Sequence, residues 1–159
     1  MSAALTHLNE KGEAHIVDVG GKAVTARRAV AEARITAEPA TVAAIMGGTL
    51  GKGDALAVAR IAGIMAAKKT SELIPLCHPI ALNKVEIEIA SAAGHILVTA
   101  TAEATDRTGV EMEAMTAAAV AALTLYDMAK SIDRAMSFTV ALIEKSGGKS
   151  GPYRRATGR

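Results

Sequence analysis

The scarcity of aromatic residues is the feature that most constrains how this chain can fold. Half of its 159 residues are hydrophobic, yet it contains two Tyr, one Phe and no Trp. The core must therefore consist of Ala, Val, Ile, Leu and Met, which bury less area per side chain than aromatic residues do. A chain of this length is about one domain, and it leaves about a third of its unfolded surface exposed after folding. We therefore expect one domain, residues 1–159, that buries further surface by forming an oligomer.

Composition and charge argue against several classes of protein. Charged residues make up 21% of the chain, which with 50% hydrophobic residues is unlike a disordered chain, and the apolar stretches are shorter than the ~18 residues of a membrane span. The segment Met1–Glu10 lacks the features of a signal peptide, and the single Cys77 cannot form an internal disulfide, so we expect a cytoplasmic location. A net charge of +2 and few aromatic residues argue against nucleic-acid binding.

Hydrophobic periodicity predicts both strands and helices. Strands are predicted over His15–Val19, Thr25–Thr36, Val85–Ile89, Ile96–Glu103 and Met136–Ile143, and helices over Pro39–Met46, from about Asp54 to Lys69, and over Glu111–Ile132. From Thr25 onward the order is strand, helices, strand, strand, helix, strand. This order is typical of the split βαβ, or ferredoxin-like, fold of the α+β class, in which helices pack on one face of an antiparallel sheet. Both termini, about 1–12 and 146–159, are expected to be flexible.

The loop Gly51–Asp54 places a lysine between two glycines directly before a predicted helix. Backbone N–H groups at a helix start, beside the Lys52 ammonium, form an anion site. The same sequence is also typical of an ordinary capping loop in which Asp54 is the N-cap. The spacing favours the capping loop and leaves the anion site open.

The segment Leu73–Pro79 holds one Cys and one His between two prolines. Adjacent side chains of an extended chain point to opposite sides, so Cys77 and His78 are poorly placed to act as nucleophile and base. A chain with one Cys is also a poor candidate for a structural zinc site. Two interpretations stay open: a buried Cys beside a hydrogen-bonded His, which is the more common case, and a stiff segment whose free backbone binds a planar ligand.

The predicted helix Glu111–Ile132 has its charges concentrated near its two ends. Asp127 and Lys130 are three residues apart and can pair, which on a protein surface is worth roughly a few tenths of a kcal/mol. Glu113 and Asp127 lie close to one helix face but ~21 Å apart along the axis. If both are functional, a neighbouring chain must bring them together in one site.

The sequence KSGGKSG at Lys145–Gly151 contains the Gly-Lys-Ser of phosphate-binding loops. The spacing does not fit, because that motif requires a Gly at the position of Ile143 and a helix after the loop. The segment is therefore either a Lys- and Gly-rich contact for phosphate or a disordered tail.

Taken together, these segments resemble the molybdenum cofactor biosynthesis protein C family, the cyclic pyranopterin monophosphate synthases. The resemblance runs from Leu5–His7 and Val17–Val19 to the KSGGKSG tail. Its most specific strings are KGD (Lys52–Asp54), ARIAGI (Ala59–Ile64), AAKKT (Ala66–Thr70), LIPLCHP (Leu73–Pro79), GVEMEA (Gly109–Ala114) and ALTLYDMAK (Ala122–Lys130). The resemblance implies a ferredoxin-like fold and a homohexamer, built as a trimer of dimers with active sites at a dimer interface.

The resemblance also implies a reaction and a set of site residues. The family converts 3′,8-cyclo-7,8-dihydroguanosine 5′-triphosphate, a cyclised GTP intermediate, to cyclic pyranopterin monophosphate and pyrophosphate, a lyase step early in molybdenum cofactor biosynthesis. Carried over by motif, the catalytic groups are Asp127, Lys130 and Lys52. The substrate-contacting residues are Leu76, Cys77, His78, Met112 and Glu113, with Lys68, Arg27 and Lys145 as further anion or base contacts. The sequence has no recognisable metal motif, and we expect neither a metal nor a cofactor.

The chemistry of this reaction suits these residue types. Opening and closing the ring system needs proton transfers, which a Lys can perform while Asp127 either orients that Lys or shuttles a proton. Closing a cyclic phosphate as pyrophosphate leaves needs positive charge near the developing anion, which Lys and Arg supply. The sequence departs from common members of the family at Ala129, often Cys, and at Met115, often Leu, and neither change removes a polar functional group on which these assignments depend. The alternative function is that of a non-catalytic module that binds a nucleotide or a pterin and senses it. A third and less favoured function is that of a structural hexamer that binds no ligand.

Overall fold

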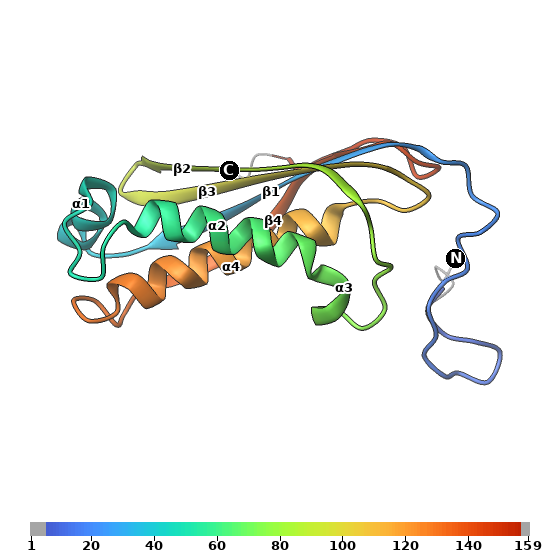
Figure 1. Ribbon diagram of the computed structural model, residues 1–159, viewed down its shortest axis with the longest axis horizontal. Coiled ribbons are helices and arrows are strands. Elements are labelled where there is room, and N and C mark those ends of the chain that lie inside the picture. Colours follow the sequence, from blue (N-terminus) through green and yellow to red (C-terminus); the bar gives the residue numbers. More distant parts are fainter. Residues whose placement is uncertain (1–5, 157–159) are drawn as a thin grey trace.

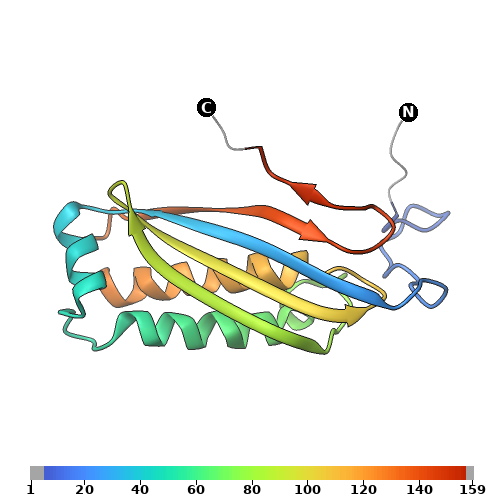
Figure 2. The same ribbon diagram turned by 90° about the horizontal axis from the view of Figure 1, so that it is seen from above.

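A five-stranded antiparallel sheet carries the helices on one of its faces (Figure 1). The computed structural model describes residues 6–156. The elements are β1 (Thr25–Thr36), α1 (Pro39–Gly47), α2 (Ala55–Lys68), α3 (Thr70–Leu73), β2 (Leu82–Ala92), β3 (His95–Asp106), α4 (Glu111–Ala129), β4 (Ser137–Ser146) and β5 (Tyr153–Arg154). The strands lie in the order β2-β3-β1-β4-β5 (Figure 2). The sequence of β1, helices, β2, β3, α4 and β4 confirms the predicted α+β, ferredoxin-like class.

Local sequence signals set the ends of several elements. Ala93 and Gly94 have positive φ values of 50° and 79°, which is the conformation of a tight two-residue hairpin turn between β2 and β3. The Asp54 carboxylate accepts a hydrogen bond of 3.0 Å from the backbone N–H of Ala57 and caps α2 as predicted. Helix α1 ends at Gly48, whose φ of 70° is accessible to glycine at little cost.

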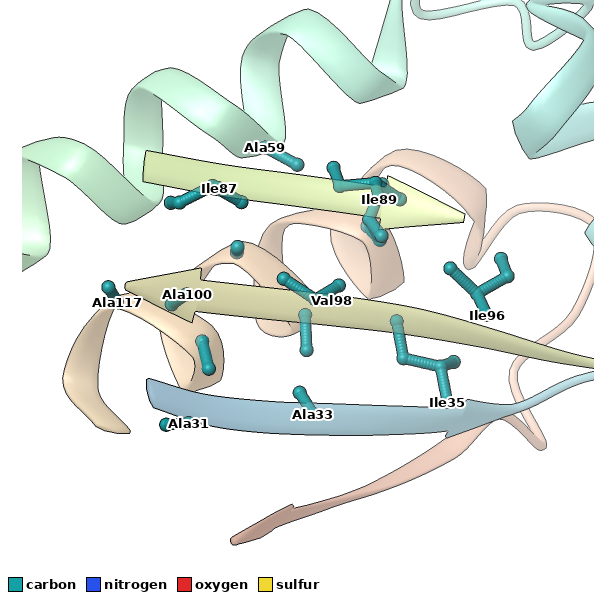
Figure 3. Close-up of a cluster of buried hydrophobic side chains, with 14 of the residues drawn as sticks. Ala31, Ala33, Ile35, Ala59, Ile87, Ile89, Ile96, Val98, Ala100 and Ala117 are labelled. Atoms are coloured by element: carbon teal, nitrogen blue, oxygen red, sulfur yellow. The ribbon is translucent and has the colours of Figure 1, made fainter. Parts of the chain in front are cut away.

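The core lies between the sheet and helices α2 and α4 and is built from small aliphatic side chains. Figure 3 shows side chains of β1, β2 and β3 pointing toward the helices. Helix α4 faces them with a row of buried alanines, and small residues allow a helix to approach a sheet closely. At Gly63 of α2, an added Cβ would come within 2.9 Å of the Ala117 carbonyl oxygen. No aromatic side chain is buried in the described part of the chain, which confirms the predicted aliphatic core.

The structure corrects part of the predicted element list. The prediction of a strand over His15–Val19 is wrong, because this segment lies outside the sheet and its Val17 carbonyl accepts a hydrogen bond from His78 instead. Helix α4 ends at Ala129 rather than Ile132, and β4 runs to Ser146 rather than Ile143. Helix α3 and strand β5 were not predicted at all.

The chain termini are described only in part. The predicted flexible ends, about 1–12 and 146–159, include residues 1–5 and 157–159, which lie outside the described residues. Within the described part of the C-terminal segment, Tyr153 pairs with Lys145 and Arg154 pairs with Glu144, so that β5 extends the sheet beyond β4.

The apolar stripe of α2 faces away from the core. Val58, Ile61 and Met65 are 43%, 60% and 53% exposed, while the buried positions of this helix are held by alanines and Gly63. The spacing of the apolar residues therefore predicts the helix correctly, but these residues lie on the outer face of α2 and not on its core face.

None of the helices in the described residues is both long enough and apolar enough to span a membrane.

Candidate active site

Two lysines converge on one carboxylate at the C-terminal end of α4. The Lys130 ammonium lies 2.8 Å from one oxygen of Asp127, and the Lys52 ammonium lies 3.2 Å from the other. Lys52 also donates a hydrogen bond of 2.9 Å to the Asp127 backbone carbonyl. The hydrogen bonds from Lys130 and Lys52 lower the pKa of Asp127, so this carboxyl group is ionised at neutral pH. We call these three residues the lysine cluster.

The fold explains how residues 75 positions apart meet in the lysine cluster. Helices α2 and α4 run side by side in opposite directions, so the start of α2 lies beside the end of α4 (Figure 1). The loop before α2 is tied down by the Asp54 cap and turns at Gly53, whose φ is 102°. The loop therefore caps the helix and also carries Lys52 to Asp127. The structure confirms the capping loop that the spacing favoured, and the anion site stays a prediction.

The opposite end of α4 borders a cavity of about 310 Å³, which we call the first cavity. Its lining includes all five of the predicted substrate-contacting residues of the two motifs, Leu76, Cys77, His78, Met112 and Glu113. The ring nitrogen Nε2 of His78 donates a hydrogen bond of 2.7 Å to the Val17 carbonyl, which fixes the imidazole against the cavity wall. The structure thus brings LIPLCHP and GVEMEA together as the resemblance implies.

The carboxyl group of Glu113 is unusual because it is buried. The residue is only 4% exposed, and burial raises its pKa to about 7, with smaller contributions from the charges of Glu111 and Asp106. Burial, followed by the nearby Glu113 carboxylate, also raises the pKa of the Cys77 thiol. A thiol with a raised pKa is a poor nucleophile at neutral pH. Among the described residues no hydrogen bond joins Cys77 to His78, which agrees with the prediction that they are not a catalytic pair.

Arg27 and Lys145 line a larger cavity of about 1050 Å³, which we call the second cavity. The Arg27 guanidinium donates hydrogen bonds to the backbone carbonyls of Asp106 and Arg107, at 3.3 and 3.1 Å. Lys68 does not join either group, because it lies beside a separate cavity between α2 and β2. Of the three predicted anion contacts, the structure therefore brings Arg27 and Lys145 together and leaves Lys68 apart.

Several cavity residues were missed by sequence reasoning. His7, Val17, Val19, Lys22 and Glu111 all line the first cavity. His7, the two valines and Glu111 belong to strings that carry the family resemblance, so those strings contained the signal. Lys22 follows the Gly20–Gly21 turn, and no local pattern distinguishes it from a solvated surface lysine.

The lysine cluster and the two cavities lie at opposite ends of α4. Glu113 is in the first turn of this helix and Asp127 is in its last, which at 1.5 Å per residue separates them by about 21 Å. One chain therefore does not bring its own cluster to its own cavities. Within residues 6–156, no three His, Cys, Asp or Glu side chains are grouped so that they could hold a metal ion.

Comparison with known proteins decides the family. Residues 16–148 match the MoaC family, and this range includes every predicted site residue. The chain belongs to the MoaC family. It is 55% identical over 153 residues to a cyclic pyranopterin monophosphate synthase of Parvibaculum lavamentivorans, covering 94% of this chain and 96% of that protein. The resemblance found in the sequence is thus confirmed.

Two further relatives agree with this MoaC family assignment. A cyclic pyranopterin monophosphate synthase of Thermomicrobium roseum is 54% identical, covering 96% of this chain and 94% of the relative. A protein of Mycobacterium bovis named cyclic pyranopterin monophosphate synthase 3 is 55% identical, covering 95% of this chain and 86% of the relative. The similarity therefore extends across both the cluster and the cavities.

Proposed function

We propose that this chain is a cyclic pyranopterin monophosphate synthase. It converts 3′,8-cyclo-7,8-dihydroguanosine 5′-triphosphate to cyclic pyranopterin monophosphate and releases pyrophosphate, and it is a lyase of molybdenum cofactor biosynthesis. The names of three relatives, each 54% or 55% identical over more than nine-tenths of this chain, support this function. The observation that carries the proposal on the structural side is the convergence of Lys52 and Lys130 on Asp127.

The lysine cluster suits the proton transfers of this reaction. An ionised carboxylate between two ammonium groups fixes the position of both, so that each can give or take a proton at a defined point. Removing Asp127 leaves the two lysines without a common partner. We therefore assign Lys52 and Lys130 as acid and base groups, and Asp127 as the group that orients them.

The two cavities suit the binding of the substrate. The first cavity combines apolar side chains such as Leu76, Ile80 and Met112 with polar groups that include His78 and Glu113, and such a mixed lining can hold a flat ring system with hydrogen-bonding edges. The second cavity adjoins it and carries Arg27 and Lys145, which can bind phosphate oxygens. Lys68 lies near a third cavity, and we retain it as a further anion contact.

The active site is proposed to be shared between two chains. The distance along α4 separates the lysine cluster from the cavities, and a second copy with its α4 antiparallel can place its cluster at the first chain's cavities. The outer face of α2 exposes Val58, Ile61 and Met65, and Leu123 of α4 is 55% exposed, which supports burial against another copy. We propose a homohexamer built as a trimer of dimers.

We also propose that this is a single-domain protein that acts in the cytoplasm on a small molecule. It is proposed to need neither a metal nor a cofactor and to bind neither nucleic acid nor membranes. The lone Cys77 and the net charge of +2 support this assignment.

The decisive experiment is incubation of the purified protein with the cyclised GTP intermediate and assay of pyrophosphate. We expect this incubation to produce pyrophosphate and cyclic pyranopterin monophosphate in equal amounts. Binding of the intermediate without pyrophosphate release would instead support a non-catalytic sensor. Arg60→Ala is a suitable control, because Arg60 is exposed on α2 and lines neither cavity.

A further inference from the structure

A buried carboxylate in the turn after α4 has no part in either cavity. Among the described residues two carboxylic side chains are buried, Glu113 and Asp133. Glu113 lines the first cavity, whereas Asp133, which is 7% exposed, lies between α4 and β4 and lines neither the first cavity nor the second. Burying a carboxylate costs free energy unless hydrogen bonds replace the lost water. The contacts of Asp133 therefore show what this side chain does.

The Asp133 carboxylate binds backbone N–H groups of two different segments. Its Oδ2 accepts a hydrogen bond of 3.0 Å from the N–H of Glu38, and its Oδ1 accepts one of 3.0 Å from the N–H of Ala135. The hydrogen bond from Glu38 lowers the pKa of Asp133 most, and the one from Ala135 lowers it further, so the carboxyl group is ionised at neutral pH. Hydrogen bonds to an ionised group are stronger than those between neutral groups. Asp133 therefore connects the turn after α4 to the segment that precedes α1.

The turn that Asp133 holds also carries Lys130. The N–H of Lys130 donates a hydrogen bond of 2.8 Å to the Tyr126 carbonyl. The N–H of Asp133 donates one of 3.2 Å to the Ala129 carbonyl. The Tyr126 hydroxyl donates a hydrogen bond of 3.0 Å to the Arg134 carbonyl across the same turn. The Lys130 side chain therefore leaves the backbone at a fixed point, three residues before Asp133.

The segment that Asp133 holds on its other side leads to Lys52. Helix α1 begins after Glu38, whose own side chain makes no capping hydrogen bond, and Asp133 supplies negative charge where the helix dipole favours it. The loop after α1 carries Lys52 and contains a hydrogen bond of 3.1 Å from the N–H of Gly53 to the Leu50 carbonyl. Helix α1 and the C-terminal end of α4 lie at the same end of the molecule (Figures 1 and 2). Asp133 thus joins the two chain segments that bring both lysines to the cluster.

We propose that Asp133 is a positioning residue for the lysine cluster, because its carboxylate holds together the two segments from which Lys52 and Lys130 reach Asp127. Its effect on turnover rests on the proposed function, whereas its effect on the turn does not. Asp133→Asn keeps the shape of the side chain but replaces one acceptor oxygen with an amide NH₂ group. One of the two backbone N–H groups then loses its acceptor. Tyr126→Phe loosens the same turn more gently, because it removes one hydroxyl group and leaves the carboxylate in place.

Amide hydrogen exchange of the full-length protein tests this connection without any turnover. Asp133→Asn is expected to speed exchange of the Lys130 N–H about tenfold, and Tyr126→Phe about threefold, because the turn opens more often. Ile87→Val is the control for a general loss of stability, since it removes a buried methyl group that packs against Gly63 of α2. If Asp133→Asn lowers Tm more than this control does, Ile87→Ala replaces it. Exchange at Lys130 that stays unchanged in both Asp133→Asn and Tyr126→Phe would overturn the proposal.

Turnover of the cyclised GTP intermediate tests whether the connection serves the lysine cluster. Asp133→Asn should lower kcat about tenfold and change KM by less than about twofold, because a displaced lysine slows proton transfer while the cavities stay intact. The Ile87 variant with the same Tm should keep the wild-type kcat. Equal kcat values in Asp133→Asn and that control would show a merely structural role and overturn the proposal. Exchange at Lys130 that depends on Asp133 in a protein without pyrophosphate release would instead support the connection and contradict the proposed function.

Discussion

The two ends of α4 carry carboxyl groups in opposite environments. At the N-terminal end Glu113 is buried beside Cys77, and burial raises its pKa to about 7. At the C-terminal end the side chain of Asp127 is 56% exposed, and hydrogen bonds from two lysines lower its pKa. Near neutral pH both the protonated and the ionised form of Glu113 are populated, whereas Asp127 stays ionised.

This difference shows how one helix supports two roles. Burial makes the protonated form of Glu113 available, so that it can donate a hydrogen bond to a ligand in the first cavity. Ion pairing keeps Asp127 charged, so that it can hold two cationic groups in place. Under the proposed function, binding and proton transfer belong to different ends of α4, and we propose a site shared between two chains as the arrangement that unites them.

The largest expected effect is at the lysine cluster. Lys130→Ala and Lys52→Ala are each expected to reduce turnover by about a thousandfold or more, because each removes a group that transfers protons. Both side chains are about half exposed, so the variants should fold and assemble normally. Pyrophosphate release measures the turnover, and Arg60→Ala serves as the control. Near wild-type rates in either alanine variant would contradict the assignment of the cluster.

The buried carboxyl group should make stability depend on pH. The pKa of Glu113 is higher in the folded state, about 7, than its ordinary value of 4.5, so the native state binds more protons between these values. The free energy of unfolding should therefore fall as pH rises from 4.5 to above 7, by about 3 kcal/mol from this group. Glu113→Gln should abolish this loss. Denaturant unfolding at several pH values and one protein concentration measures the difference.

Asp127→Asn is the matched control for Glu113→Gln. The pKa of Asp127 is lowered below its ordinary value of 3.8, so stability from this group is present above that value and is lost only as pH falls below it. The substitution should therefore leave the slope between pH 4.5 and 7 unchanged. If the wild-type protein and Glu113→Gln show the same slope in this window, Glu113 does not titrate as a buried group.

The smallest effect is expected at Cys77. Its thiol is half-buried with a raised pKa, so we expect it to form part of the cavity wall and not to act as a nucleophile. Cys77→Ala should keep activity within about threefold of the wild-type value, since it changes packing without removing a reacting group. Complete loss of turnover with an unchanged melting temperature would indicate thiol chemistry instead.

Local patterns predicted the regular elements well. The mixture of β-forming residues with Ala and Arg over Thr25–Thr36 predicted the bounds of β1, and the Ala93–Gly94 turn predicted the hairpin. His15–Val19 alternates between apolar and polar residues, yet it packs along the first cavity and pairs with no strand. Strand pairing requires a partner elsewhere in the chain, and alternation alone carries no information about that partner. Strand β5 was not predicted for the same reason, because it forms only by pairing with the edge of β4.

The candidate site was predictable where its residues lie in one motif or on one helix. The Asp127–Lys130 pair follows from its spacing, whereas the contact of Lys52 with Asp127 depends on the packing of α2 against α4. The second cavity is assembled from three separate stretches of the chain, so no single sequence motif predicts it. The family resemblance assigned a role to Arg27 and Lys145 and included Lys149 only as part of the KSGGKSG string, and it gave no indication of Arg107.

The central claim is that each active site combines the first cavity of one chain with the lysine cluster of its partner. His78→Ala and Lys130→Ala are each expected to be inactive alone, because each damages one half of every site. After dissociation and joint reassembly, about half of the dimers should be mixed, and one of the two sites in each should be intact. Pyrophosphate release should then recover to about a quarter of the wild-type rate. Verified mixed oligomers that recover no activity would contradict the shared site.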